Sequence, residues 1–230
     1  VDALEVFSLQ EEIPFVHIGS AKLDQAKNIF QIHLSPARVN FIAGLITVLI
    51  APDRRAGGLF SVEDPDNAQW MNAFVNGAAY LCGRCMPVYA PVISFPITSA
   101  VSESQGFQGR KNAFDQLDQN RLEVLYLTPQ AVTSEMLDYL ASQSIRVVGS
   151  GPPPEGYNSI WAATVTENVA PMLDQLWSEM FQSDVSGQVL EAPIAIRDIN
   201  DQILSPGRQQ LVEKIASDLV DGWIEPLSIP

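Results

Sequence analysis

The segment Leu122–Ser150, LEVLYLTPQAVTSEMLDYLASQSIRVVGS, carries the clearest signal of the fold class. It begins with a short apolar run over 122–127, which is typical of a buried strand. Thr133 is suited to cap a helix over 134–142, and a second apolar run follows at 145–148. A strand, a helix and a second strand in this order predict a parallel β-α-β unit.

Similar units recur along the chain, so we expect an α/β fold with parallel sheets flanked by helices. We expect further strands at 15–18, 28–34, 57–62, 87–94, 160–165 and 189–196. We expect further helices at about 36–51, 70–81, 103–117, 169–180 and 206–219.

The units are distributed unevenly, which predicts two lobes with an incomplete N-terminal lobe. Two strands and one helix precede Gly57, whereas about five β-α units follow it. We therefore expect a partial N-terminal lobe over 1–55 and a C-terminal α/β lobe over 56–190. Residues 191–230 would form the return through the hinge and a C-terminal segment that packs on the N-terminal lobe.

Composition excludes several classes of partner. The chain has 230 residues and a formal net charge of −14, whereas a nucleic-acid-binding protein needs a basic face. The same charge disfavours anionic membrane surfaces. The longest apolar run, Phe41–Ala51, is too short to span a bilayer, which takes about 20 apolar residues. The chain starts at Val1 with no signal peptide, so we expect that an N-terminal segment has been removed or left out.

The two cysteines, Cys82 and Cys85, lie in one Cys-x-x-Cys sequence. A zinc site would need two further ligands, and His17 and His33 are distant in the sequence. A thioredoxin-type pair stands at the start of a helix, whereas this pair ends a helical pattern. The interpretations left are a local disulfide or two thiols without a role.

Small and hydroxyl-bearing residues follow most of the predicted strands. In open parallel sheets, ligands bind beyond the carboxyl ends of the strands, where such residues can hydrogen-bond a polar ligand and aromatic rings can stack on a flat one. The candidate ligand-binding residues are Ser20, Phe95, Thr128, Ser150, Tyr157 and Thr166.

Motifs for nucleotide binding or catalysis are absent from the sequence, so we expect no enzyme activity, no cofactor and no metal. Gly149-Ser-Gly151 is followed by three prolines, which lack the N–H groups that a phosphate-binding loop uses. His17 and His33 lie inside predicted strands, where histidine is more often structural than catalytic. An α/β hydrolase or nucleotide-dependent protein with Asp64 or His33 at its site is the enzyme alternative, although the turn that holds Asp64 and Asp66 is more typical of a solvated loop.

Seven segments of the sequence share the order and spacing of one known family: Arg38–Leu45, Gly57–Val62, Phe74–Gly77, Lys111–Leu117, Val124–Thr128, Ile145–Gly149 and Gly187–Pro206. They resemble the basic-membrane-protein (BMP) family, the substrate-binding lipoproteins of ABC transporters with the type 1 periplasmic-binding-protein fold. The resemblance covers almost the whole chain, but the family's first β-α units have no counterpart here.

The resemblance implies an extracytoplasmic, lipid-anchored protein that closes two lobes on a small ligand and delivers it to a membrane permease. Nucleosides are the best-known ligands of the family, and charged side chains hold their ribose. In this chain Gly19 and Gly151 stand where the family has aspartate, and 162–167 lacks the expected lysine. We therefore expect a small polar, nucleoside-like ligand, although the missing charged contacts argue against an ordinary nucleoside. A ligand-sensing or interaction module that has lost transport is the alternative.

Overall fold

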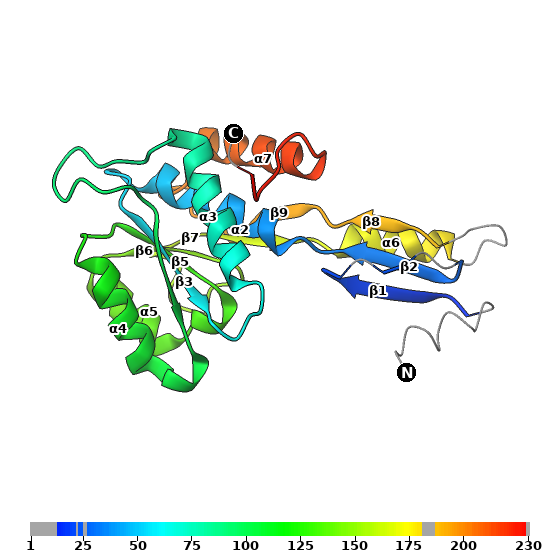
Figure 1. The fold of residues 1–230 in the computed structure, drawn as a ribbon, viewed down its shortest axis with the longest axis horizontal. Helices are drawn as coiled ribbons and strands as arrows, with labels where there is room; N and C mark the ends of the chain where they lie inside the picture. Colours follow the sequence, from blue (N-terminus) through cyan, green and yellow to red (C-terminus); the bar gives the residue numbers. More distant parts are fainter. Residues whose placement is uncertain (1–12, 22, 25–26, 181–186, 229–230) are drawn as a thin grey trace. The chain divides into compact units, whose positions relative to one another are not determined.

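A computed structural model of the chain describes residues 13–21, 23–24, 27–180 and 187–228. Contacts divide the chain into two compact units, and the ribbon is shown in Figure 1. The smaller unit comprises Val1–Pro36 and Glu167–Ile194, and the larger unit comprises Ala37–Thr166 and Ala195–Pro230. The chain therefore passes between the units at three points.

The smaller unit is built on a three-stranded parallel sheet with strand order β1-β2-β8. Its strands are β1 (Phe15–Gly19), β2 (Ile29–His33) and β8 (Val189–Glu191), and its helix is α6 (Ala170–Glu179). The helix packs against β2, and the core of the unit is formed by Phe30, Ile32, Leu176 and Ala192.

The larger unit is built on a six-stranded sheet with strand order β4-β3-β5-β6-β7-β9, in which the pairs from β4 to β7 are parallel. Its strands are β3 (Ala56–Ser61), β4 (Ile97–Val101), β5 (Val124–Leu127), β6 (Arg146–Gly149), β7 (Trp161–Glu167) and β9 (Ile194–Arg197). Its helices are α2 (Pro36–Ile50), α3 (Asn67–Cys82), α4 (Gly106–Asp118), α5 (Ser134–Ser142) and α7 (Pro206–Val220), with 3-10 turns η1 (Glu103–Gln105) and η2 (Pro129–Ala131).

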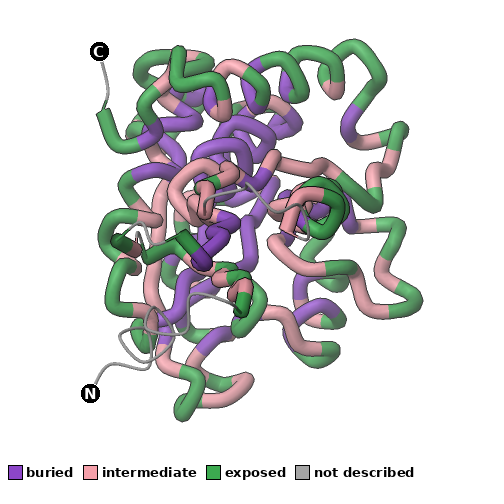
Figure 2. The backbone as a smooth tube through the Cα atoms, turned by 90° about the vertical axis from the view of Figure 1, so that its right-hand side faces the viewer, coloured by how far each residue is buried: buried purple, intermediate pink, exposed green. Residues whose placement is uncertain are grey.

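The central strands of this sheet are buried because helices cover both faces. Strands β3 and β5 are buried along their whole length. Figure 2 shows the backbone coloured by burial, with the buried residues in purple. Leu125 and Leu127 face a cluster that includes Phe114 of α4 and Leu137 of α5. Tyr126 points to the opposite face, where it stacks on Phe74 of α3.

Helices α2 and α3 cross at unusually close range. A Cβ atom added to Gly44 of α2 would lie 1.9 Å from the Phe74 carbonyl oxygen, and one added to Gly77 of α3 would lie 1.8 Å from the Phe41 carbonyl oxygen. The two backbones therefore touch through their glycines, with no side chain between them. This contact holds α2, most of whose residues are buried, in the interior of the larger unit.

The β-α-β unit predicted from Leu122–Ser150 is confirmed as β5, α5 and β6. The strand expected at 87–94 is wrong, because the strand of this region is β4, Ile97–Val101. Pro87 and Pro91 have no N–H to donate to a neighbouring strand, and the segment forms an exposed loop instead.

The single strand expected at 189–196 is also divided. It breaks at Ala192-Pro193 into β8, which pairs in the sheet of the smaller unit, and β9, which pairs in the sheet of the larger unit. The observed units also differ from the expected boundaries at 55 and 190. Residues 37–55 and 195–230 both group with the larger unit, since α2 fills its core and Asn76 Nδ2 of α3 donates to the Pro226 carbonyl oxygen at 3.0 Å.

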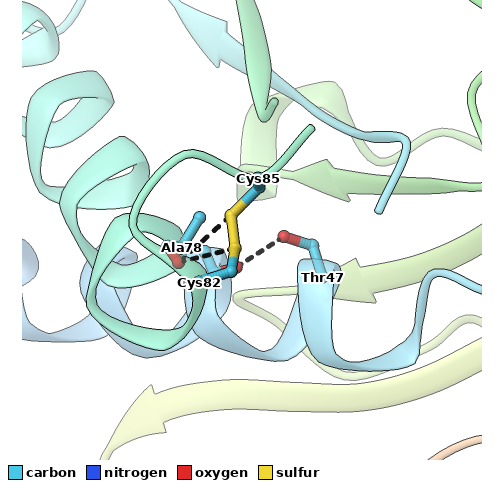
Figure 3. The surroundings of a disulfide bond; sticks show 5 residues. Thr47, Ala78, Cys82 and Cys85 are labelled. Atoms are coloured by element: carbon cyan, nitrogen blue, oxygen red, sulfur yellow. Dashed lines mark hydrogen bonds between the residues drawn. A yellow bond between two sulfur atoms is a disulfide. The ribbon is translucent and has the colours of Figure 1, made fainter. Parts of the chain in front are cut away.

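Cys82 and Cys85 form a disulfide at the end of α3 (Figure 3). Both sulfur atoms lie 3.3 Å from the Ala78 carbonyl oxygen, and Cys85 is fully buried. Of the two interpretations left by the sequence, the structure has the disulfide. Across the described ranges, none of the helices has both the length and the apolar composition required to cross a bilayer.

Candidate functional site

Thr128 and Ser150 follow neighbouring strands at the carboxyl edge of the larger unit's sheet. Leu127 at the end of β5 pairs with Gly149 at the end of β6, so the next residues of the two strands stand side by side. Because side chains alternate along a strand, Thr128 and Ser150 lie on the same sheet face as Tyr126. The structure thus brings together two of the six candidate residues.

The hydroxyl oxygens of this pair are buried. Thr128 Oγ1 has no hydrogen-bond partner among the residues that the structure describes, and Ser150 Oγ lies near the Tyr126 phenol without a hydrogen bond of ordinary geometry. An unsatisfied buried hydroxyl lowers the free energy of unfolding by about 1–3 kcal/mol. Two such hydroxyls side by side are therefore uncommon in folded proteins. Each hydroxyl can donate one hydrogen bond and accept two, which suits recognition of a polar ligand.

Three aromatic rings lie beneath this pair. Tyr126 stacks on Phe74 with 5.3 Å between ring centroids, and Phe60 meets both rings edge-on at 5.6 Å. Burial raises the pKa of Tyr126 to about 12, and the nearby Ser150 hydroxyl opposes that shift in part. Tyr126 therefore stays a neutral phenol at physiological pH, and the hydroxyls of Thr128 and Ser150 add uncharged polar groups beside these rings.

Other polar groups at this edge are already satisfied. Thr164 Oγ1 accepts from Trp161 Nε1 at 3.0 Å and donates to the Gly151 carbonyl oxygen at 3.2 Å. Glu63 accepts from the hydroxyls of Ser61 and Ser102, at 2.7 and 2.5 Å. These hydrogen bonds, with Ser102 first, lower the pKa of Glu63 to about 2, so this carboxylate is ionised.

Arg110 of α4 is a buried residue at this edge that sequence reasoning missed. Its Nη2 atom donates to the Gln130 carbonyl oxygen at 2.9 Å, beside the end of β5. An arginine in an amphipathic helix reads as a surface residue in the sequence, so nothing in the pattern around 110 predicted its burial.

In the smaller unit, His33 joins the ends of three strands. Its Nδ1 atom lies 3.0 Å from Glu191 Oε2 at the end of β8, and its Nε2 atom lies 3.1 Å from the Ser20 carbonyl oxygen after β1. Candidate Ser20 therefore takes part through its backbone.

The remaining candidate residues are placed elsewhere. Phe95 is buried in the core at the amino end of β4, where its N–H donates to the Cys85 carbonyl oxygen at 2.9 Å, so it offers no ring to a ligand. Tyr157 donates to Asp138 of α5 at 2.9 Å, and this bond raises its pKa. Thr166 is the last residue but one of strand β7 and is partly exposed.

The acidic turn after β3 has the features of a solvated loop. Asp64 Oδ1 accepts from the Asp66 N–H at 3.0 Å, and both residues lie at or near the surface. Within the described ranges, no three residues of the types His, Cys, Asp and Glu come together as a metal site would require.

Comparisons with known proteins bear on the fold. No protein-family model matches the sequence, and no curated protein matches it either. Among solved structures, an ABC transporter solute-binding protein from Conexibacter woesei matches with a TM-score of 0.73 and 13% identity, over 96% of this chain and 74% of that chain. A transcriptional activator of the comK gene from Bacillus halodurans matches with a TM-score of 0.71 and 13% identity, over 96% and 75%. A myo-inositol binding protein from Caulobacter matches with a TM-score of 0.54 and 11% identity, over 85% and 69%.

These similarities confirm the predicted fold class. The chain has an α/β fold with mostly parallel sheets flanked by helices, like that of type 1 periplasmic binding proteins. The similar structures are binding proteins and regulators. Membership of the BMP family stays a prediction.

Proposed function

We propose that this chain is the solute-binding component of an ABC transporter. It would capture a small, neutral, hydroxyl-rich solute outside the cytoplasm and deliver it to a permease in the membrane. The observation that carries the proposal is the pair of buried, unsatisfied hydroxyls of Thr128 and Ser150 at the carboxyl edge of the sheet, where ligands of parallel α/β folds bind.

The chemistry of this pair favours an uncharged ligand. The two hydroxyls can exchange hydrogen bonds with ligand hydroxyls, and the three buried rings of Phe60, Phe74 and Tyr126 form the packed floor on which this edge of the sheet rests. Gly19 and Gly151 supply no charge to a ligand. Of the charged groups described at this edge, Glu63 is occupied by two serine hydroxyls and Arg110 donates to the Gln130 carbonyl oxygen. The myo-inositol of the similar Caulobacter protein is a ligand of this class.

We also propose how the solute is held. The chain passes between the two units at 36/37, 166/167 and 194/195, and rotation about these connections would close the units on the solute. A solute shifts the equilibrium between the open and closed states only if it binds the closed state more tightly. We therefore propose that the hydroxyls of Thr128 and Ser150 form hydrogen bonds with the solute when the units close.

A lipid anchor and an extracytoplasmic location are part of the same proposal. The Cys82–Cys85 disulfide supports an oxidising compartment, where such bonds persist. Because the site holds ionised Glu63 in structural bonds and no candidate nucleophile beside a base, we propose no catalytic step.

A thermal-shift panel of neutral sugars, cyclitols, nucleosides and amino acids tests the proposal. A ligand at about 100 times its Kd adds roughly 2.7 kcal/mol to the free energy of unfolding, which is readily measured. We expect a shift with a neutral polyol or nucleoside and its loss in the Thr128→Val/Ser150→Ala double variant. A panel with no active compound, or a shift that survives in the double variant, would contradict the proposal.

A ligand-sensing module is the second candidate, because the similar Bacillus halodurans protein is a transcriptional activator. The same ligand site would then control a partner protein. Pull-down of the full chain with and without the active compound separates the two functions: a permease subunit retained in the liganded state supports transport, and a regulatory partner supports sensing.

A further inference from the structure

Residues 86–92 form a loop after the disulfide whose apolar side chains face solvent; we call it the apolar loop. Val88 is 80% exposed, Tyr89 74% and Val92 57%, and Met86 is 39% exposed. Single exposed apolar residues are ordinary on protein surfaces, but four within seven residues form a patch of the kind that marks an interaction site.

Buried polar contacts fix this loop in place. Arg55, only 4% exposed, donates through Nη2 to the carbonyl oxygens of Tyr89 (2.5 Å) and Ala90 (3.2 Å). Asp53 pairs with Arg55 at 2.9 Å and accepts from the Val88 N–H at 2.8 Å. The exposed side chains are therefore presented by an anchored backbone, with the disulfide at one end of the loop.

The apolar loop stands at the amino edge of the larger unit's sheet, opposite the edge that carries Thr128. Arg55 directly precedes β3, and its Nη1 atom donates to the Asn120 carbonyl oxygen just before β5, at 2.8 Å. An interaction at this edge therefore leaves the proposed ligand site accessible.

The charge of this edge opposes that of the whole chain. The segments 51–56, 83–95, 118–124 and 143–147 hold five arginines and three acidic residues, whereas the chain carries −14. The acids Asp53, Asp118 and Glu123 all accept hydrogen bonds from neighbouring groups. Three of the arginines are exposed, and their side chains have no ion pair or hydrogen bond with any residue that the structure describes; they are Arg54, Arg84 and Arg121.

Two of these arginines occupy backbone positions that disfavour them. Arg54 has φ of 62° and Arg121 has φ of 59°, in the left-handed region that favours glycine or asparagine. A non-glycine residue held there costs free energy and is often retained for function. Arg54 directly precedes Arg55, and Arg121 directly follows Asn120, whose carbonyl oxygen accepts from Arg55.

We propose that the apolar loop docks on an anionic lipid surface. The side chains of Met86, Val88, Tyr89 and Val92 enter the interfacial region, where tyrosine is favoured, while Arg54, Arg84 and Arg121 contact lipid phosphates. At physiological salt the Debye length is about 8 Å, so a lipid surface responds mainly to the charges nearest the loop. These are the three exposed arginines and Glu225, which lines a cavity together with Gly83.

A protein partner fits the loop less well than a lipid surface. A standard protein interface takes about 20–30 residues on each side and close shape complementarity. Seven residues on a protruding loop supply neither, whereas insertion into a lipid interface requires apolar side chains and nearby cations alone.

Sedimentation of the full chain with vesicles tests the proposal. The probes are phosphatidylcholine vesicles with and without phosphatidylglycerol at about one lipid in four. We expect binding to the mixed vesicles that weakens as salt rises. The Val88→Ser/Tyr89→Ser variant should bind at least about tenfold more weakly, and the Arg54→Asn/Arg121→Asn variant about fivefold or more.

The asparagine variant keeps the test independent of folding. Asparagine tolerates the left-handed conformation, so this variant removes two charges without adding strain. Val62→Ser, at another exposed valine, is the matched control and should bind like the parent. Failure of the parent to bind, or equal binding by the parent and the Val88→Ser/Tyr89→Ser variant, would overturn the proposal. Cross-linked dimers that the same loop variant abolishes would overturn it in favour of a protein partner.

Discussion

Thr128 and Ser150 stand side by side at the ends of β5 and β6, and each buries a hydroxyl oxygen that no described residue hydrogen-bonds. A chain selected only for stability would place alanine or valine at these positions, because an apolar group there needs no partner. The pair therefore indicates that this edge of the sheet is shaped for binding, at a cost to the stability of the unliganded protein.

Replacement of this pair should stabilise the unliganded protein. Thr128→Val and Ser150→Ala each remove an unsatisfied hydroxyl, so we expect the free energy of unfolding to rise by roughly 1 kcal/mol per site. Thermal melting without ligand measures this, as an increase of about 2–4 °C per kcal/mol. The control is Thr164→Val, whose hydroxyl bonds Trp161 and Gly151; this change should destabilise.

The crossing of α2 and α3 should not tolerate a methyl group. In Gly44→Ala the new Cβ would lie 1.9 Å from the Phe74 carbonyl oxygen, which forces two buried helices apart. We expect a loss of more than about 3 kcal/mol, measured by urea unfolding. Gly207→Ala in α7 has no atom within 4 Å of the added Cβ and should be neutral or slightly stabilising.

Glu63 should make stability depend on pH in the acid range. Its pKa falls from 4.5 to about 2 on folding, chiefly through the hydroxyls of Ser102 and Ser61. A depressed folded pKa contributes stability above about pH 4.5, and that contribution is lost as pH falls toward 2. The destabilisation caused by Glu63→Gln should therefore be largest at neutral pH and shrink across this window.

The control for this pH series is Glu155→Gln, at an exposed loop position. It should follow the parent protein throughout in urea unfolding between pH 2 and 7. A Glu63→Gln deficit that stays constant with pH would argue against the two serine hydrogen bonds as its cause.

Arg55 should be essential to the order of the apolar loop. Arg55→Met removes the donor to Tyr89, Ala90 and Asn120 and leaves Asp53 without its ion pair. Loss of these hydrogen bonds should free the backbone of the loop, and limited proteolysis should then cut within 86–94. Arg208→Met, at an exposed site in α7, should leave both stability and cleavage unchanged.

The fold was readable from the sequence because it depends on short-range patterns. Apolar runs, the Thr133 cap and the spacing of strands identified β5, α5 and β6 without any tertiary information. The same patterns gave a wrong prediction for 87–94, because its valines and tyrosine are typical of a strand. Pro87 and Pro91 cannot donate to a neighbouring strand, and Arg55, more than thirty residues earlier, binds the carbonyl oxygens of Tyr89 and Ala90.

The site was predictable only in part. Thr128 and Ser150 follow predicted strands, so counting residues past each strand end was enough to find them. Phe95 was misplaced because its position depended on the wrong strand, and the residue lies at the opposite edge. The bond from Tyr157 to Asp138 and the burial of Arg110 depend on tertiary packing, which single-sequence patterns do not encode.

The glycine contact between α2 and α3 also governs how this fold can be recombined. Helix α2 follows β2 of the smaller unit after only two residues, yet it belongs to the larger unit. Its glycine contact with α3 holds it there. A chimaera that exchanges ligand-binding halves with a related protein must therefore be joined at Pro36, Glu167 and Ile194, so that α2 travels with α3. Joints placed after α2 would separate the two glycines, and the recombined halves would inherit mismatched helices.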